Sequence, residues 1–319
     1  MARELQIVGL GAGAFPQLTQ EAQRALLKAK KIYCRYRSLL LDYFIEKHKK
    51  LVISFQCFYH NPRLLNDGGR SQVYEAIAHS IVHEALHNDG IVYALPGSVW
   101  IAETTPFLIY EIAKRKRLKV NTILGVSFID VIFNSLPEKY RQDKQAQFSL
   151  VRAGNLHITP FNKNFSYILV AMEDMARIYT IKGMIRILSK HYSPDYKLLL
   201  MYMTKGKDGF SYRERSIEFK VKDMHKIYKI FRKRDWDGSL FVPASSSEAG
   251  EDLHSSRGHG SALYGDNAFL QGDLKFEEGL AYYRLGRYRE ALRCAHEALA
   301  NSQRKEVPLL IEACRRKLQ

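Results

Sequence analysis

Short apolar runs alternate with amphipathic stretches along the first 135 residues of the chain. The apolar runs predict strands, and the stretches between them, whose apolar residues recur at helical spacing, predict helices. Such alternation predicts a parallel sheet covered by helices on both faces, with ligands at the carboxyl ends of its strands. The expected order is strand 4–9, helix 19–30, strand 31–35, helix 38–47, strand 51–55, helix 70–87, strand 91–95, helix 101–115, strand 118–123 and helix 127–136.

A different pattern begins near residue 140, with longer strands at 167–173 and 196–204, an amphipathic helix between them and a last strand at 239–243. We therefore expect an α/β protein with a first domain at 1–136, built on a parallel sheet, and a second at 137–243, built on a mixed sheet. Residues 244–265 are rich in Ser, Gly and His, which predicts a flexible linker.

The remaining segment, residues 266–319, is predicted to be helical and resembles one tetratricopeptide repeat. Gly279 and Tyr282 have the G-x-x-Y spacing of that repeat. The turn and the small residues that let two helices approach are Leu285, Gly286, Ala291, Ala295 and Ala298. An ordinary helical hairpin explains the pattern equally well. A single repeat cannot bury its own apolar face, so we expect the segment to dock on the body of the protein or on another subunit.

Composition favours a soluble globular protein, with 46% hydrophobic and 26% charged residues. No apolar stretch reaches the roughly 18 residues of a membrane span, and MARELQIVGLG begins a strand rather than a signal peptide. We therefore expect a cytoplasmic protein with no membrane association. The four cysteines lack C-x-x-C spacing, which predicts reduced structural thiols at Cys34, Cys57, Cys294 and Cys314.

The formal net charge of +16 and the basic clusters at 114–119 and 231–235 suit a polyanionic partner. No helix-turn-helix, zinc-finger or RNP pattern accompanies them, so we do not expect nucleic-acid binding. An anionic small substrate and a merely basic surface both remain open.

The turn after the first strand, IVGLGAGAFPQLT, fits the dinucleotide pattern G-x-G-x-x-[GA] at Gly9, Gly11 and Ala14. In a dinucleotide site the helix begins within the glycines, whereas here three residues intervene before Thr19, the expected N-cap. The second strand ends in Arg35, where an acid would be needed to hold a ribose hydroxyl. These departures favour a plain strand-turn-helix.

A literal H-E-x-x-H occurs at His83, Glu84 and His87, a spacing that can hold zinc on a helix while the glutamate activates water. Asn88-Asp89-Gly90 ends the helix at once, and no third ligand follows in a recognised arrangement. We therefore expect a row of polar residues on a solvated helix face and no metal site.

Two predicted strands, which we expect to be adjacent, end in turns of small residues at one sheet edge. One turn contains Pro96 and Gly97, and the other contains Gly125 and Ser127. Backbone amides and carbonyls at such turns suit a flat or folded cofactor, although tight turns alone would look similar.

The order VGLGAGAFPQLT, VYALPGSVWIAETTPFLI, ILGVSFIDVIF, YILVAME and SLFVP resembles the tetrapyrrole methylase superfamily over residues 1–243. The most similar branch is the methylase-like domain that precedes MazG pyrophosphohydrolases. The resemblance implies two α/β domains, S-adenosylmethionine in the cleft between them, and a homodimer. It also implies that the first glycine turn lines that cleft and holds no phosphate. The tail lacks the carboxylate cluster of a MazG domain, so we do not expect nucleotide pyrophosphohydrolysis.

The resemblance carries over to single positions. Cofactor-binding residues implied in this way are Pro96, Gly97, Ser98, Ile101, Ser127 and Met172. Three residues depart from the family pattern: Ser98 replaces an acid or imidazole, Val99 replaces proline, and Ala14 replaces aspartate. Binding through the backbone survives these changes. They nevertheless motivate an alternative, a non-catalytic scaffold that recruits a partner protein through its C-terminal helices.

The methyl acceptor is left open between two classes. A tetrapyrrole-like anion suits the basic charge. A peptide substrate is suggested by the borosin backbone N-methyltransferases of the same superfamily, which place an arginine and a tyrosine one helical turn apart over the acceptor amide. Arg70 and Tyr74 have that spacing and are the candidate catalytic residues. In the alternative interpretation, Tyr74 packs against the protein and Arg70 lies in a solvated first turn.

Overall fold

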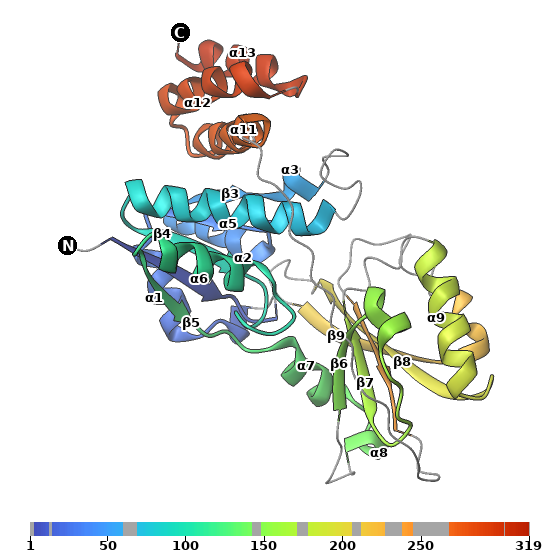
Figure 1. Cartoon of the computed structure of the whole chain (residues 1–319). Coiled ribbons are helices and arrows are strands. Elements are labelled where there is room, and N and C mark those ends of the chain that lie inside the picture. The colour runs from blue at the N-terminus through green and yellow to red at the C-terminus, as the bar shows by residue number, and fades with distance from the viewer. Residues whose placement is uncertain are drawn as a thin grey trace. The chain divides into compact units, whose positions relative to one another are not determined.

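Two five-stranded sheets organise the part of the chain that the structure describes (Figure 1). The structure is a computed structural model, and the residues it describes are 3–12, 15–59, 69–141, 148–170, 178–205, 212–226, 238–244, 268–302 and 304–318. The chain forms two compact units, Met1–Phe128 with Ala262–Gln319, and Ile129–Ser261. Residues 245–265 of the expected linker lie outside the described ranges.

The first unit contains the parallel sheet that the sequence predicts. Its strands are β1 Glu4–Gly9, β2 Lys31–Cys34, β3 Leu51–Ser54, β4 Ile91–Leu95 and β5 Lys119–Ile123, in the order β3-β2-β4-β1-β5. All four neighbouring pairs run parallel. Strand β4 is buried along its whole length, as the continuous apolar run IVYAL predicts for a central strand covered on both faces.

Helices cover both faces of this sheet, as two separate clusters of buried side chains show. Helices α1 Gln20–Lys28 and α2 Leu39–His48 pack on the face that carries Val8 and Val92. Helices α5 Gly69–His87 and α6 Thr105–Arg115 pack on the face that carries Leu5 and Tyr93. A short helix, α3 Gln56–Tyr59, follows β3.

The sequence predicts the start of α1 well and the start of α6 badly. Thr19 accepts a hydrogen bond from the Ala22 amide at 3.1 Å and so caps α1, as expected. The helix expected from residue 101 is wrong in its first turn, because α6 begins only at Thr105 with Pro106 next to it. Ala102 has φ +58°, in the left-handed region, which excludes it from a helix.

The second unit contains the mixed sheet. Its elements are α8 Glu138–Arg141, β6 Phe148–Arg152, β7 Ser166–Val170, α9 Ile178–His191, β8 Lys197–Lys205, β9 Tyr212–Lys220 and β10 Gly238–Val242, and α7 Phe128–Ser135 leads into it. The strand order is β6-β7-β10-β8-β9, with only β6 and β7 parallel. Strands β6 and β9 are not among those that the sequence predicted. Strand β9, YRERSIEFK, is mostly polar and pairs along its length with the apolar β8.

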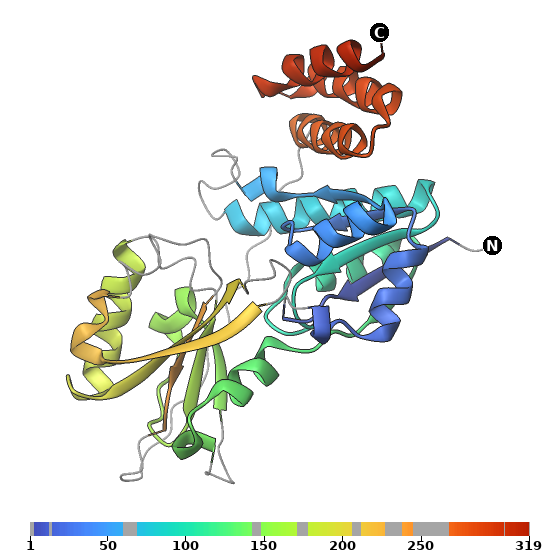
Figure 2. The same cartoon turned by 180° about the vertical axis from the view of Figure 1, so that it is seen from behind.

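Three helices end the chain: α11 Ala268–Arg284, α12 Tyr288–Asn301 and α13 Glu306–Leu318 (Figure 2). They dock on the first unit, where α11 contacts β3 and α3 and joins the buried cluster of α5 and α6. Gly279 allows the helices to approach closely, since a Cβ there would lie 3.2 Å from Leu310 and 3.3 Å from the Ala291 carbonyl oxygen. The resemblance to a tetratricopeptide repeat stays a prediction. No helix within the described ranges is long and apolar enough to cross a membrane.

Candidate functional site

Three glycine turns meet at the carboxyl edge of the parallel sheet. The expectation that β4 and β5 are adjacent is wrong, because β1 lies between them and pairs with both. The turn after β1 therefore joins the other two. The Gly97 amide donates to the Gly11 carbonyl at 2.6 Å, and the Leu10 amide donates to the Leu95 carbonyl at 2.7 Å.

Two of these glycines permit contact between backbones. A Cβ on Gly9 would lie 2.5 Å from the Gly125 nitrogen, and a Cβ on Gly125 would lie 2.4 Å from the Gly97 oxygen. Helix α1 starts only after the 3₁₀ helix Phe15–Gln17. The described part of the first glycine turn thus serves chain packing, and Ala14 lies outside the described residues.

Gly97 differs from Gly9 and Gly125 because a Cβ at its position would make only ordinary contacts. Its φ of +73° favours glycine, and a Cβ built there would have the Phe128 ring at 3.8 Å as its nearest contact. Gly97 is itself buried and its amide is paired with Gly11, so a large side chain at this position would displace the surrounding loop.

The loop from Gly97 to α6 contains both buried and partly exposed residues. Val99 is fully buried and Glu103 nearly so, whereas Ser98 and Ile101 are half-buried and Pro96 is exposed. The left-handed Ala102, which costs an ordinary residue roughly 1–2 kcal/mol, lies between the anchors. Strain of this kind persists where the surroundings fix the backbone, and it is frequent at ligand sites.

The structure brings most of the predicted cofactor residues to one sheet edge. The loop after β4 carries Pro96, Gly97, Ser98 and Ile101, and Ser127 follows Gly125 in the turn after β5. Met172 lies outside the described residues, so its predicted role stays a prediction. The cofactor-binding role of each of these positions stays a prediction.

Glu103 forms a buried ion pair that the sequence analysis missed. Arg35, directly after β2, donates from Nη1 to Glu103 Oε2 at 3.1 Å, and their side chains are only 15% and 5% exposed. Burial opposes the charge on Arg35, but Glu103 outweighs burial and raises the pKa of the guanidinium above its usual value. Two features of the sequence could have indicated this pair. An arginine follows a buried strand directly, and the loop from Gly97 to Thr105 contains a single charged residue, the acid.

Tyrosine rings connect this ion pair with the predicted acceptor residue Tyr74. The Arg35 guanidinium lies over the Tyr36 ring, 5.2 Å from its centroid. Tyr36 contacts Tyr59, whose ring centroid is 4.9 Å away, and Tyr59 contacts Tyr74 at 6.3 Å. Tyr74 is buried, and burial raises the pKa of Tyr59 well above its usual value. Arg70 lies in the first turn of α5, and its side chain is outside the description.

Glu84 of the H-E-x-x-H motif takes part in an ion-pair network. Lys31 Nζ lies 3.3 Å from Glu84 Oε2 and 2.9 Å from Glu278 Oε1 of α11. His87 Nδ1 is 2.8 Å from the His83 carbonyl oxygen. Within the described ranges, no three side chains of the metal-ligating types come together. Lys31 therefore joins β2 to α5 through Glu84 and to α11 through Glu278.

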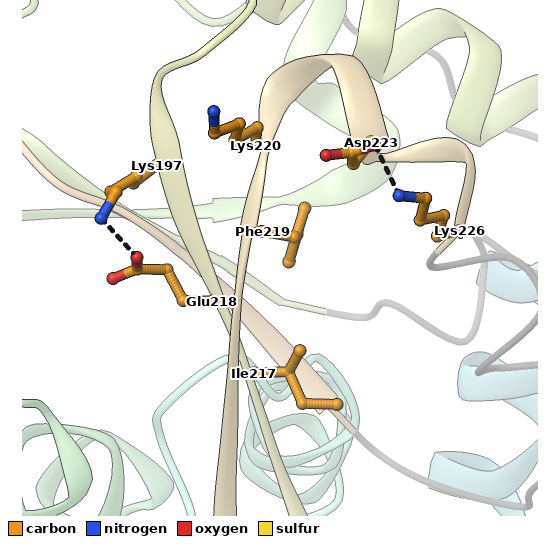
Figure 3. A pocket seen from close by; sticks show the side chains of 7 residues that line it. All are labelled: Lys197, Ile217, Glu218, Phe219, Lys220, Asp223 and Lys226. Atoms are coloured by element: carbon orange, nitrogen blue, oxygen red, sulfur yellow. Dashed lines mark ion pairs between the residues drawn. The ribbon is translucent and has the colours of Figure 1, made fainter.

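A hollow of about 470 Å³ lies on the second unit and does not involve any predicted site residue (Figure 3). It is lined by Lys197, Ile217, Glu218, Phe219, Lys220, Asp223 and Lys226. Each lysine of the lining has a carboxylate partner, because Lys197 pairs with Glu218, Lys226 with Asp223 and Lys220 with Asp195. With these charges balanced, the hollow offers no concentrated attraction for an anion.

Comparison with known proteins identifies the family of the chain. A sequence model of the tetrapyrrole (corrin/porphyrin) methylases matches residues 4–203. The chain belongs to this family. The match covers the parallel sheet and reaches into β8, and the C-terminal helices lie beyond it. The uncharacterized protein YabN of Bacillus subtilis (strain 168) is 30% identical over 201 residues, which are 63% of this chain and 38% of that relative. The matched region thus spans less than two fifths of that relative's length.

Solved structures show the same fold. The uroporphyrin-III-C-methyltransferase of Thermus thermophilus aligns with a TM-score of 0.54 and 15% identity, covering 76% of this chain and 93% of that one. A cobalt precorrin-4 methyltransferase aligns with a TM-score of 0.50 and 14% identity, covering 75% and 94%. At these identities the likeness concerns the fold alone.

Proposed function

We propose that this protein is an S-adenosylmethionine-dependent methyltransferase whose cofactor binds at the turn after β4. The observation that carries the proposal is the meeting of three glycine turns at the carboxyl edge of a parallel sheet, where only Gly97 has room for a Cβ without a clash. Membership of the tetrapyrrole methylases supports it. The departures Ser98 and Val99 are compatible with it, because Val99 packs in the core and binding relies on the backbone.

In this proposal the chain holds and orients two molecules. The cofactor supplies a methyl group on a sulfonium, which an acceptor atom with a lone pair displaces. Backbone groups of the loop that follows Gly97, from Ser98 onward, would hold the cofactor, with Ile101 as an apolar contact and Ser127 from the turn after β5. Positioning the acceptor in line with the methyl group, away from water, supplies most of the rate enhancement.

The test is calorimetric titration with S-adenosylmethionine and S-adenosylhomocysteine. We expect micromolar binding to the wild type and its loss in Gly97→Trp, because an indole at this buried position would displace the loop proposed to hold the cofactor. Gly286→Trp is the matched control, since Gly286 also has φ +73° and has no neighbouring atom within 4 Å of its Cβ position. A wild type that binds neither compound would refute the proposal.

The acceptor is proposed at the level of two classes, a tetrapyrrole-like anion and a peptide backbone amide. The net charge of +16 favours the first, and the spacing of Arg70 and Tyr74 on one helix favours the second. Tyr74 is buried beside Tyr59, so any role in proton removal requires the acceptor to reach it from that side.

A second candidate function is a scaffold without turnover, motivated by Ser98, Val99 and Ala14. Deletion of the C-terminal helices is no clean test of it, because α11 belongs to the core of the first unit. The exposed Leu299 and Leu309 allow a better one. If Leu299→Ser with Leu309→Ser abolishes the cellular function while Gly97→Trp preserves it, the scaffold is favoured, and the opposite result favours the enzyme.

A further inference from the structure

Arg35 and Tyr59 bring two buried polar atoms without partners to the carboxyl end of the sheet. Arg35 Nε and the Tyr59 hydroxyl oxygen are both inaccessible to solvent, and neither makes a hydrogen bond with any residue that the structure describes. Leaving such a group unpaired costs about 1–3 kcal/mol, so native proteins rarely keep it without a use. At Tyr59, a purely structural role would be served better by an apolar ring.

The ion pair with Glu103 fixes the direction of the Arg35 guanidinium. Because Nη1 donates to Glu103, rotation of the planar group is restricted and the Nε–H direction is set. Glu103 belongs to the loop that starts at Gly97, so the arginine is tied to the proposed cofactor turn. The Arg35 side chain is 15% exposed and Tyr59 is half-buried, so both residues reach the surface although their unpaired atoms do not, and a ligand would bind these atoms by displacing the side chains that cover them.

The two atoms belong to one cluster. Tyr36 contacts both residues, with the Arg35 guanidinium 5.2 Å and the Tyr59 ring centroid 4.9 Å from its own centroid. Tyr59 in turn contacts Tyr74, the predicted acceptor residue. The unpaired N–H and O–H thus lie between the proposed cofactor loop and the helix proposed to face the acceptor.

We propose that Arg35 and Tyr59 form a subsite that binds a carbonyl oxygen of the methyl acceptor, an inference that rests on the proposed function. Both groups are hydrogen-bond donors, so they suit an oxygen with two lone pairs. Glu103 already balances the charge of Arg35, and a second carboxylate would be buried without compensation. The subsite therefore selects a neutral amide carbonyl over a carboxylate, and it favours the peptide class of acceptor.

The experiment follows the Arg35 Nε–H signal in the NMR spectrum of the ¹⁵N-labelled full chain, saturated with S-adenosylhomocysteine. Arg35→Lys identifies the signal by removing it while keeping the positive charge. The probes are N-methylacetamide, the simplest peptide amide, and sodium acetate, the simplest carboxylate, at equal ionic strength. We expect a saturable shift of this signal with the amide and a smaller shift with acetate.

Tyr59→Phe isolates the tyrosine hydroxyl. It should weaken amide binding roughly 3- to 10-fold, the equivalent of one hydrogen bond, while the melting temperature stays equal or rises because an unpaired hydroxyl is removed. Tyr110→Phe, at an exposed tyrosine, should change neither quantity. A lower melting temperature of Tyr59→Phe with unchanged amide binding would assign the hydroxyl a structural role and overturn the proposal.

Two further outcomes would also overturn it. No shift with either probe would exclude the subsite, and an acetate shift as large as the amide shift would exclude the preference for a carbonyl. Binding of S-adenosylhomocysteine by the wild type is measured separately, so failure of the subsite and failure of the methyltransferase function remain distinguishable.

Discussion

At Gly125 the backbone leaves no room for a Cβ. The added carbon would lie 2.4 Å from the Gly97 oxygen and 2.6 Å from the Gly9 carbonyl carbon, and neither atom belongs to a side chain that could move away. The same contacts hold the three turns of the candidate site together. A substitution at Gly125 should therefore affect both the stability of the protein and the shape of the proposed cofactor turn.

We therefore predict that Gly125→Ala destabilises the protein by about 1–3 kcal/mol or more through overpacking, and weakens S-adenosylhomocysteine binding as well. Urea unfolding and calorimetric titration check both effects. The control is Gly183→Ala in helix α9, where no atom lies within 4 Å and the free energy of unfolding should rise by up to about 1 kcal/mol. Equal stability of the two variants would contradict the prediction.

Glu278 gives a prediction about acid stability. Burial alone would raise its pKa, but Lys31 and Lys275 outweigh burial and hold the pKa below its usual value of 4.5. Because the folded-state pKa is lowered, its contribution to stability is present above about pH 4.5 and is lost as the pH falls through the folded-state value.

Glu278→Gln should thus lower the free energy of unfolding at pH 7 by about 1.5–3 kcal/mol and flatten its fall in acid. Urea unfolding at a series of pH values from neutral to acid measures both. Glu290→Gln, on an exposed pair of α12, should change little by comparison. A Glu278→Gln variant with the acid profile of the wild type would show that the carboxylate does not carry this dependence.

At the scale of elements, helix α11 packs against the edge strand β3 of the parallel sheet. Strand β3 is an edge strand, and an edge exposes unpaired backbone groups that can recruit other chains. Helix α11 packs beside β3 with Leu274, Phe276 and Tyr282 buried. The C-terminal segment therefore completes the first unit and protects one of its edges.

From this packing we predict that Phe276→Ala costs about 3–5 kcal/mol of stability, the usual effect of emptying a buried aromatic position. Deleting residues 268–319 should cause aggregation, since it uncovers the edge and the apolar cluster together. Thermal unfolding and light scattering measure the two outcomes. Leu309→Ala on α13, where the leucine is 64% exposed, is the control and should be nearly neutral. A monomeric, stable truncated chain would refute this role of α11.

On the scale of the whole molecule, the first unit joins the two ends of the chain. Its four cysteines come from both ends of the chain. Cys34 and Cys57 lie near the sheet, and Cys294 and Cys314 lie on α12 and α13. All four are free and buried, in agreement with the expectation of structural thiols. Burial raises the pKa of Cys34 and of Cys294 to about 12, so both stay protonated at neutral pH.

We expect all four thiols to resist a disulfide reagent in the native protein and to become reactive together at one urea concentration. The physical reason is that the C-terminal helices share a buried cluster with the sheet and should unfold with it. Mass spectrometry after labelling identifies which cysteines react. Earlier reaction of Cys294 and Cys314 would show instead that the helices unfold as a separate unit.

Local patterns in the sequence were sufficient for the elements of the first unit and for its fold class. Apolar runs located every strand of the parallel sheet, and Thr19 was identified as a cap, because strands of buried sheets and helix starts depend on neighbouring residues. The order of the quoted motifs along the chain was sufficient to identify the tetrapyrrole methylase family. The start of α6 and the polar strand β9 were missed, since a left-handed Ala102 and pairing with a distant strand leave no local signal.

The sequence by itself determined the alternation of elements, the residues of the glycine turns and the resemblance to the tetrapyrrole methylases. Only the tertiary structure decided that β1 separates β4 from β5, that Glu103 pairs with Arg35, and that α11 covers β3. The physical reason is that periodicity and caps act between near neighbours, whereas strand order and buried ion pairs join residues far apart in the chain. The residues argued to bind the acceptor belong to this second group.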